Sequence, residues 1–124
     1  MGTRSTVAFY SEHEPRKVLL KVYQQYDGYI DGVGHELANF LESKKVVNGF
    51  GATEQTMENG YANGMGCLAA QYVAEHKTAI GGFYMTTNDD KQEYNYKVKF
   101  IDGEFNIKVD TFSGTPDELL NYNE

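Results

Sequence analysis

Three short segments of the chain combine an acidic or amide residue with two glycines in the pattern Asp/Asn-Gly-x-Gly. Glycines let other atoms approach the backbone closely, and the first amide groups of a helix have no partner inside that helix. Such a helix entrance can hold a phosphate or a carboxylate, although the same pattern also suits a tight turn without a ligand. The segments are Asp31-Gly32-Val33-Gly34, Asn48-Gly49-Phe50-Gly51 and Asn63-Gly64-Met65-Gly66.

The first and third segments lead into helix-like sequence, and we expect these entrances to bind a small anionic or nucleotide-like ligand. In this hypothesis Arg4 or a nearby lysine supplies the counter-charge, and a tyrosine between residues 23 and 29 stacks on a base. No segment continues as a lysine-containing phosphate loop or a full dinucleotide fingerprint, so the motif alone does not identify the ligand. The predicted ligand-binding residues are Arg4, Tyr26, Asp27, Tyr29, Gly32, Gly34, Asn63, Gly64 and Gly66.

Two other residues could support catalysis or metal binding. Cys67 falls in the first turn of a predicted helix, a position at which a cysteine can act as a nucleophile, but no base partner is near it in the sequence. His35 lies near Asp27 and Asp31, but it has no second histidine four residues on. We therefore expect no catalytic residue, no metal ion and no cofactor, and a small hydrolase using Cys67 or His35 is the least favoured alternative.

The composition limits the class of partner. The chain has 124 residues, enough for one domain, and its formal net charge of −7 argues against general binding to nucleic acid or anionic membranes. Lys97 and Lys99 alternate along one predicted strand and Lys108 lies on the next, so the strands can form a local basic face. The single cysteine, with no signal-peptide pattern and no membrane-length apolar run, leads us to expect a cytoplasmic protein.

Hydrophobic periodicity predicts the elements that position these residues. Asp31 and Asn63 are the expected N-caps of two helices, and Asp102-Gly103 predicts a two-residue hairpin turn. Residues 46–63 are predicted to be a loop that one short strand or turn can interrupt. The predicted strands cover residues 3–10, 17–25, 81–87, 93–101 and 104–112, and the predicted helices cover residues 32–45 and 64–76.

This order, β-β-α-α-β-β-β, predicts an α+β fold in one domain spanning residues 1–124. We expect an antiparallel sheet of about five strands, covered on one face by two helices. Thr115, Pro116 and Glu118 predict a short terminal helix with a capping box. The other face of the sheet would carry tyrosines and lysines, and we expect its aromatic residues to form a homodimer.

Three motifs carry a resemblance to a known family. They are Gly2-Thr3-Arg4-Ser5, Tyr23-Gln24-Gln25-Tyr26-Asp27-Gly28-Tyr29 and Asn63-Gly64-Met65. With them the chain resembles a group of small uncharacterised proteins of phages, large DNA viruses and some bacteria, over most of its length. That family has no established activity, so the resemblance assigns no catalytic residue. It implies a viral or mobile-element origin and action in the host cytoplasm.

The sequence thus favours a non-enzymatic binding protein that could sequester a host signalling nucleotide without any chemistry. The alternative is a protein-interaction module that inhibits a host defence protein through an acidic, tyrosine-rich surface.

Overall fold

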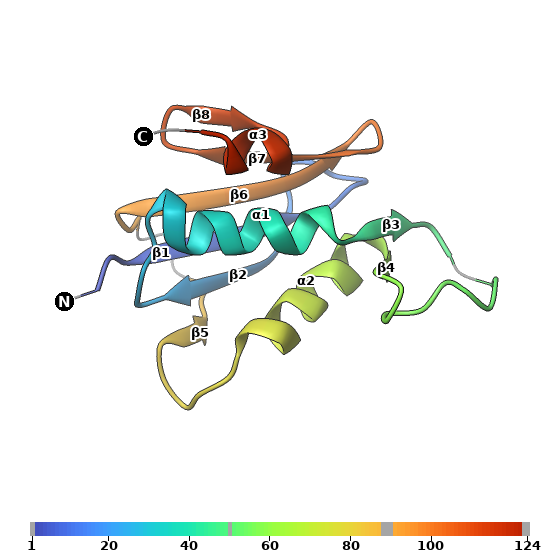
Figure 1. Ribbon diagram of the computed structural model, residues 1–124, viewed down its shortest axis with the longest axis horizontal. Coiled ribbons are helices and arrows are strands. Elements are labelled where there is room, and N and C mark those ends of the chain that lie inside the picture. Colours follow the sequence, from blue (N-terminus) through green and yellow to red (C-terminus); the bar gives the residue numbers. More distant parts are fainter. Residues whose placement is uncertain (1, 50, 88–90, 123–124) are drawn as a thin grey trace.

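A mixed β-sheet of six strands forms the framework, and the helices lie on one side of it (Figure 1). The computed structural model describes residues 2–49, 51–87 and 91–122. The order of strands across the sheet is β5-β2-β1-β6-β7-β8. In chain order the strands of this sheet are β1 (Ser5–Tyr10), β2 (Val18–Gln24), β5 (Phe83–Met85), β6 (Tyr94–Ile101), β7 (Glu104–Val109) and β8 (Phe112–Gly114).

The α+β class is confirmed, but the predicted antiparallel sheet is wrong in one pairing and in its number of strands. β1 pairs antiparallel with β2 and parallel with β6, so that Val7 lies opposite both Val22 and Tyr96. The alternation of residues predicts each hairpin, because a hairpin is a local structure. It does not predict how two hairpins that are distant in the sequence pair with each other. Here the parallel pairing of β1 with β6 requires a long connection, and the helices lie in the segment between β2 and β6.

The middle of the chain forms the helices and a small second sheet. A π-helical turn, η1 (Ile30–Gly34), leads into α1 (His35–Glu42), and α2 covers Gly64–His76 as predicted. Between the two helices, β3 (Lys45–Val47) pairs in parallel with β4 (Tyr61–Asn63), where the sequence predicted a loop. These strands and the described part of their connection extend away from the body of the molecule (Figure 1).

Local signals place the C-terminal turns correctly. Asp102 and Gly103 both have positive φ values, 53° and 80°, as a two-residue hairpin turn requires. The hydroxyl of Thr115 accepts from the Glu118 amide while the Glu118 carboxylate accepts from the Thr115 amide. This capping box opens the last helix, α3 (Pro116–Leu120).

The first predicted helix begins later than expected, because Asp31 does not cap it. Asp31 lies inside η1, and its carboxylate is 3.6 Å from the ring Nε2 of His35. Asn63 precedes α2 but its side chain makes no capping hydrogen bond there; its Oδ1 accepts from the Gly49 amide at 2.7 Å. The prediction for Asp31 is therefore wrong, whereas Asn63 occupies the N-cap position of α2 as expected but does not cap it with its side chain.

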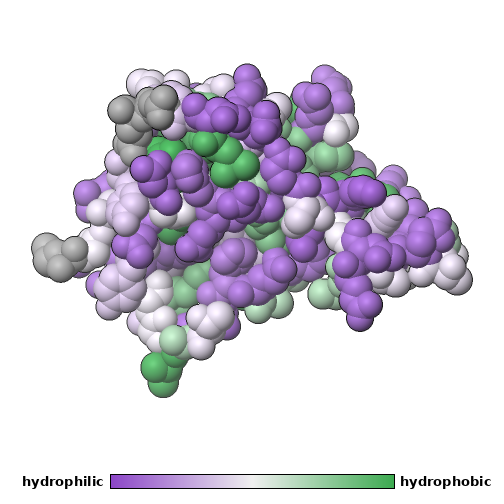
Figure 2. Space-filling view, viewed as in Figure 1, coloured by the Kyte–Doolittle hydropathy of each residue, from purple (hydrophilic) through white to green (hydrophobic). Residues whose placement is uncertain are grey.

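One cluster of buried apolar side chains joins the sheet to the helices. Val7, Phe9 and Val98 point from the sheet into this cluster, where they meet Leu37 of α1 and Leu68 of α2. No helix in the described ranges is long and apolar enough to cross a membrane. The outward side of the helices is largely hydrophilic, with only scattered apolar side chains (Figure 2). Among the residues that the structure describes, no helix lies against the opposite face of the sheet, and we call it the open face.

Candidate functional site

The amino end of α2, one of the two predicted ligand entrances, is occupied by the protein itself. The Met65 amide donates to Oε2 of Glu12 at 2.9 Å. Gly64 has a φ of 82°, and a Cβ added to it would lie 3.0 Å from the same carboxylate oxygen. A carboxylate of the chain thus takes the place that an anionic ligand would need.

The entrance to α1 is also closed, in this case by backbone carbonyls of the preceding loop. The Val33 amide donates to the Asp27 carbonyl at 2.7 Å, and the Gly34 amide donates to the Tyr29 carbonyl at 3.3 Å. Gly32 lies so close to the Asp27 carbonyl that a Cβ there would collide with it. The glycine is therefore required by the packing of this loop.

The two entrances do not border a common hollow. Gly32 precedes α1, whereas Asn63 pairs with Val47, which follows α1 in the chain. The two junctions therefore lie at opposite ends of this helix (Figure 1). The expectation of one shared receptor site at these glycines is wrong. Phe50, in the middle glycine segment, lies outside the described residues.

The other predicted ligand residues divide between two places. Tyr29 donates to the Asp27 carboxylate at 3.2 Å, and this neighbouring charge raises the pKa of the Tyr29 hydroxyl above its ordinary value. Tyr26 is 61% exposed and packs against Gly82. These tyrosines lie in the loop before α1, whereas Arg4 lies in a hollow of the open face. Gly66 has open space around it.

Basic residues gather on the open face of the sheet. Ala8 lies opposite Lys21 on one side and Lys97 on the other, and Lys97 in turn lies opposite Lys108. Because directly opposed residues project to the same face, one row across four strands carries three lysines around one small residue. Lys21 and Lys97 are two strand spacings apart, about 10 Å between their backbones.

A hollow of about 440 Å³ opens over Ala8. Thr6, which is only 3% exposed, donates its hydroxyl to Oδ1 of Asn95 at 2.8 Å and fixes part of the floor. The described lining combines lysines with hydroxyl and amide groups and with the exposed apolar side chains of Val18 and Leu19. It consists of Thr6, Ala8, Tyr10, Val18, Leu19, Lys21, Thr86, Thr87, Lys91, Asn95, Tyr96 and Lys97.

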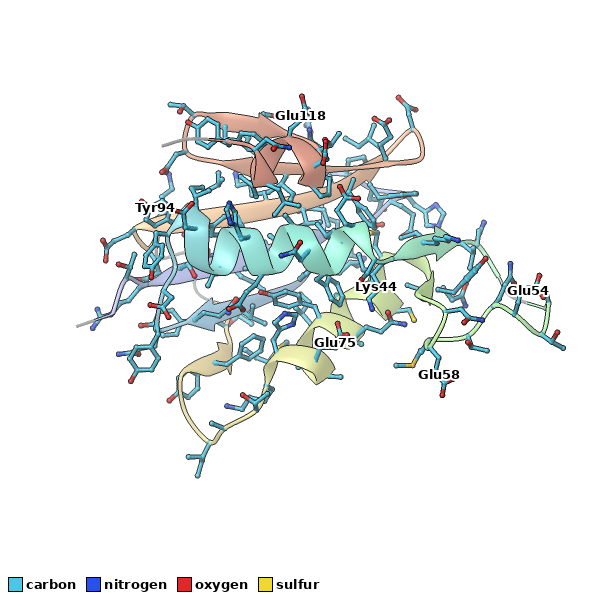
Figure 3. All side chains as sticks on the ribbon, in the orientation of Figure 1. Lys44, Glu54, Glu58, Glu75, Tyr94 and Glu118 are labelled. Atoms are coloured by element: carbon cyan, nitrogen blue, oxygen red, sulfur yellow. The ribbon has the colours of Figure 1, made fainter. Side chains whose placement is uncertain are left out.

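Two lysines of the row, Lys97 and Lys108, have no acidic partner among the described residues. In the part of the chain that the structure describes, neither Lys97 nor Lys108 forms an ion pair, although they oppose each other directly. Two like charges in this position cost about 0.2–1 kcal/mol. On the helix side, by contrast, Lys44 and Glu75 point toward one another at 3.6 Å (Figure 3).

A second hollow, of about 290 Å³, adjoins the first on the open face. The two share Thr6 and Thr86 as lining residues. The rings of Tyr23 and Tyr84 lie 6.2 Å apart in this second hollow, with a tilt of 34° between them. Its lining consists of Arg4, Thr6, Tyr23, Tyr84, Met85, Thr86 and Gln92.

Sequence reasoning found part of this site and missed the rest. The alternation of Lys97 and Lys99 predicted a basic face, whereas Arg4 was predicted as the counter-charge of a ligand at the helix entrances and lies in a hollow of the open face. Lys21 was missed, because it joins the row only through the pairing of β2 with β1 and β1 with β6. No local pattern in the sequence contains that information.

The described structure does not bring the candidate nucleophile and the candidate metal ligands together in one site. Cys67 contacts the Gln71 amide nitrogen at 3.6 Å, in a hollow beneath the connection of β3 and β4 whose described lining contains no histidine. No group of three His, Cys, Asp or Glu side chains suited to a metal ion occurs among the described residues. No protein-family model, curated protein or solved structure matches the chain. Function is therefore inferred from the side chains of the open face.

Proposed function

We propose that the protein binds a small anionic, nucleotide-like ligand in the hollow over Ala8 and sequesters it without chemistry. The observation that carries this proposal is the convergence of Lys21, Lys91 and Lys97 on one hollow of a chain whose net charge is −7. The chain contains eleven lysines and arginines in total. Three of them around one hollow form a local positive field that attracts an anion.

The chemistry of the lining suits phosphate oxygens. Lysine ammonium groups donate charge-assisted hydrogen bonds, and the hydroxyls of Thr86 and Thr87 can add neutral donors. Ala8 has no side-chain atom beyond Cβ, so a hollow remains between the two lysines that lie opposite it, Lys21 and Lys97. An anion here would also relieve the repulsion between Lys97 and Lys108, which lie opposite each other at the same register.

Binding without turnover agrees with the same lining. The described residues around the hollow include no histidine, cysteine, aspartate or glutamate. Lysines and Tyr10 are among the other described lining residues that can act as a general base or nucleophile, and burial raises the pKa of the Tyr10 hydroxyl, which makes it a weaker acid. With the viral origin that the sequence resemblance implies, we infer that stoichiometric capture of a host nucleotide would blunt a host response.

Isothermal titration with inorganic tripolyphosphate tests this proposal. We expect Lys97→Ala to raise Kd about 10-fold or more, because a hydrogen bond to a charged group contributes about 1.5–3 kcal/mol. Lys45→Ala is the matched control, since Lys45 is exposed on β3 and does not line this hollow. Absence of binding by the unmodified protein, or equal losses in both variants, would rule out the open-face site.

A protein partner is the second candidate, and one observation favours it. Tyr26 and Tyr29 are 61% and 39% exposed beside the exposed carboxylates of Asp27 and Asp31, so the loop before α1 is an acidic, tyrosine-rich surface. Such residues are common in protein interfaces. Pull-down from host lysate with the unmodified protein and with Tyr26→Ala separates the candidates: a stoichiometric host protein lost in the variant favours an inhibitor.

The homodimer expected through sheet aromatics stays a prediction. Tyr10, Tyr23 and Tyr84 line the two hollows of the open face, but Lys21 and Lys97 share that face. Pairing two such faces brings like charges together, so this dimer would require an anion between the copies. Light scattering with and without tripolyphosphate measures the mass directly, and a dimer only in its presence would support this arrangement.

A further inference from the structure

We propose that the ligand is a free nucleotide with its phosphates over the lysine row and its base in the second hollow, against Tyr23 and Tyr84. This inference rests on the proposed function, since it names the ligand class of the same open-face site. It starts from the continuity of the two hollows, which meet at Thr6 and Thr86. The two hollows therefore adjoin, and one extended ligand can contact both.

The two hollows differ in their charged and aromatic side chains. The first has three lysines, whereas the second has a single cation, Arg4, with two tyrosines among its described lining residues. A nucleotide has the same division between a charged phosphate part and a flat, nearly neutral base. An inorganic polyphosphate would use only the first hollow, and it would leave the second without a suitable occupant.

The tyrosine pair is held in place before any ligand arrives. Lys77 lies with its Nζ 5.3 Å from the centre of the Tyr84 ring, and the same Nζ donates to the Phe83 carbonyl at 2.8 Å. Tyr23 donates its hydroxyl to Oε1 of Gln25 at 3.1 Å. Tyr84 remains 48% exposed, so these anchored rings leave aromatic surface for a base to cover.

Arg4 and Gln92 add polar groups at the edge of this aromatic surface. The Arg4 side chain is exposed, and its guanidinium can stack on a base or donate to its edge. Gln92 offers both a donor and an acceptor. The second hollow therefore provides the stacking and the edge contacts by which proteins recognise a nucleobase.

The distribution of acidic residues favours a free nucleotide over a nucleic-acid strand. Asp102 and Glu104 lie where β6 turns into β7, and Glu93 and Asp110 lie at the opposite end of the same two strands. A polyanion running along the strands would pass from the lysine row into carboxylates at either end. A ligand the size of one nucleotide ends before it reaches them.

Competition of nucleoside triphosphates with inorganic tripolyphosphate tests the assignment. We expect at least one of ATP, GTP, CTP and UTP to bind about 5-fold or more tightly than tripolyphosphate, because a base stacked on an aromatic ring adds affinity on this scale. Tyr84→Ala should remove this difference and leave tripolyphosphate affinity unchanged, whereas Tyr84→Phe should retain it. Tyr29→Ala, at an exposed tyrosine outside both hollows, is the matched control.

Each outcome decides between distinct alternatives. Equal affinity for all triphosphates and tripolyphosphate would overturn the base site while leaving the anion site standing, and binding of none would overturn the proposed function itself. Tighter binding of a 15-nucleotide single strand than of any free nucleotide would overturn the choice of ligand. Should Tyr84→Ala unfold in a circular-dichroism melt, Arg4→Ala must show the same selective loss of nucleotide affinity, and its failure to do so counts against the proposal.

Discussion

The two faces of the sheet differ in how their charged and polar side chains are paired within the chain. On the covered side, two polar groups that could attract a ligand have partners within the chain: Glu12 accepts from the amide at the start of α2, and Gln24 accepts from the buried Tyr72 hydroxyl at 2.8 Å. On the open face, Lys97 and Lys108 oppose each other without an ion pair among the described residues. The glycine-rich entrances are thus parts of the scaffold, and we propose that a ligand binds where Lys97 and Lys108 have no ion pair among the described residues.

The largest expected difference between the faces is in stability. Leu37 is fully buried against the covered side, so Leu37→Ala should lower the free energy of unfolding by about 2–5 kcal/mol. Lys97→Ala on the open face should not lower it at all, because it removes a like-charge contact. Urea denaturation of both variants measures this difference, and comparable losses would mean that the open face is a structural surface.

The free energy of unfolding at alkaline pH offers a second comparison of the two faces, because Tyr72 is buried on the covered side. Burial, followed by the charge of Glu36, raises the pKa of the Tyr72 hydroxyl well above its ordinary value of 10.0. The folded state then holds a proton that the unfolded state releases, so stability is fully present below pH 10 and falls as the pH rises above it. The slope for this one group approaches about 1.4 kcal/mol per pH unit.

Urea denaturation between pH 8 and pH 11 measures this loss. The Tyr72→Phe variant should be less stable at neutral pH, since Gln24 loses its donor, but its stability should fall less steeply above pH 10. The exposed Tyr84 supplies the comparison: Tyr84→Phe should keep the slope of the unmodified protein. Equal slopes in all three proteins would refute the role of the buried hydroxyl.

A smaller effect is expected when the internal anion of α2 is removed. Glu12→Ala should lower the free energy of unfolding by about 0.5–2 kcal/mol, the range for loss of a helix cap. Added sulfate should then raise the melting temperature of this variant more than that of the unmodified protein, because an anion can occupy the vacated amides. Glu14→Ala, which removes only an exposed pair with Lys17 at 3.8 Å, is the control.

The smallest effect is a gain in stability. Lys108→Gln should raise the free energy of unfolding by about 0.2–1 kcal/mol at low ionic strength, because it removes one of two directly opposed charges. The gain should shrink in 0.5 M NaCl, where the charges are screened. A destabilised variant would show that Lys108 contributes packing or an interaction that outweighs the repulsion.

Local rules predicted much of the fold, and non-local pairing set the rest. Asp102-Gly103 and the Thr115–Glu118 capping box act over a few residues, so the sequence alone located them. The parallel pairing of β1 with β6 joins segments 89 residues apart, as the Thr6–Asn95 hydrogen bond shows. The cap of α2 likewise comes from Glu12, 53 residues away from the amide that it accepts from, which is why Asn63 was predicted instead.

The residues of the open-face site divide in the same way, into those that a local pattern predicts and those that only strand pairing brings together. Lys97 and Lys99 share a strand, so their alternation is visible in the sequence, whereas Arg4 was predicted as a counter-charge at the helix entrances. The meeting of Lys21 with Lys97 around Ala8 depends on two strand registers. The error at the glycines has a different cause: an open helix entrance and a closed one have the same local sequence, and only the packed neighbours distinguish them.

Titration of ¹⁵N-labelled protein with tripolyphosphate, followed by amide chemical shifts, tests the central claim most directly. If the ligand occupies the open face, the amides of Thr6, Ala8 and Lys97 shift in a saturable way. The chemical shifts of the Val33 and Met65 amides, which already donate hydrogen bonds to Asp27 and Glu12, then remain unchanged. Shifts concentrated at those two helix entrances, or no saturable shifts at all, would contradict an anion site on the open face.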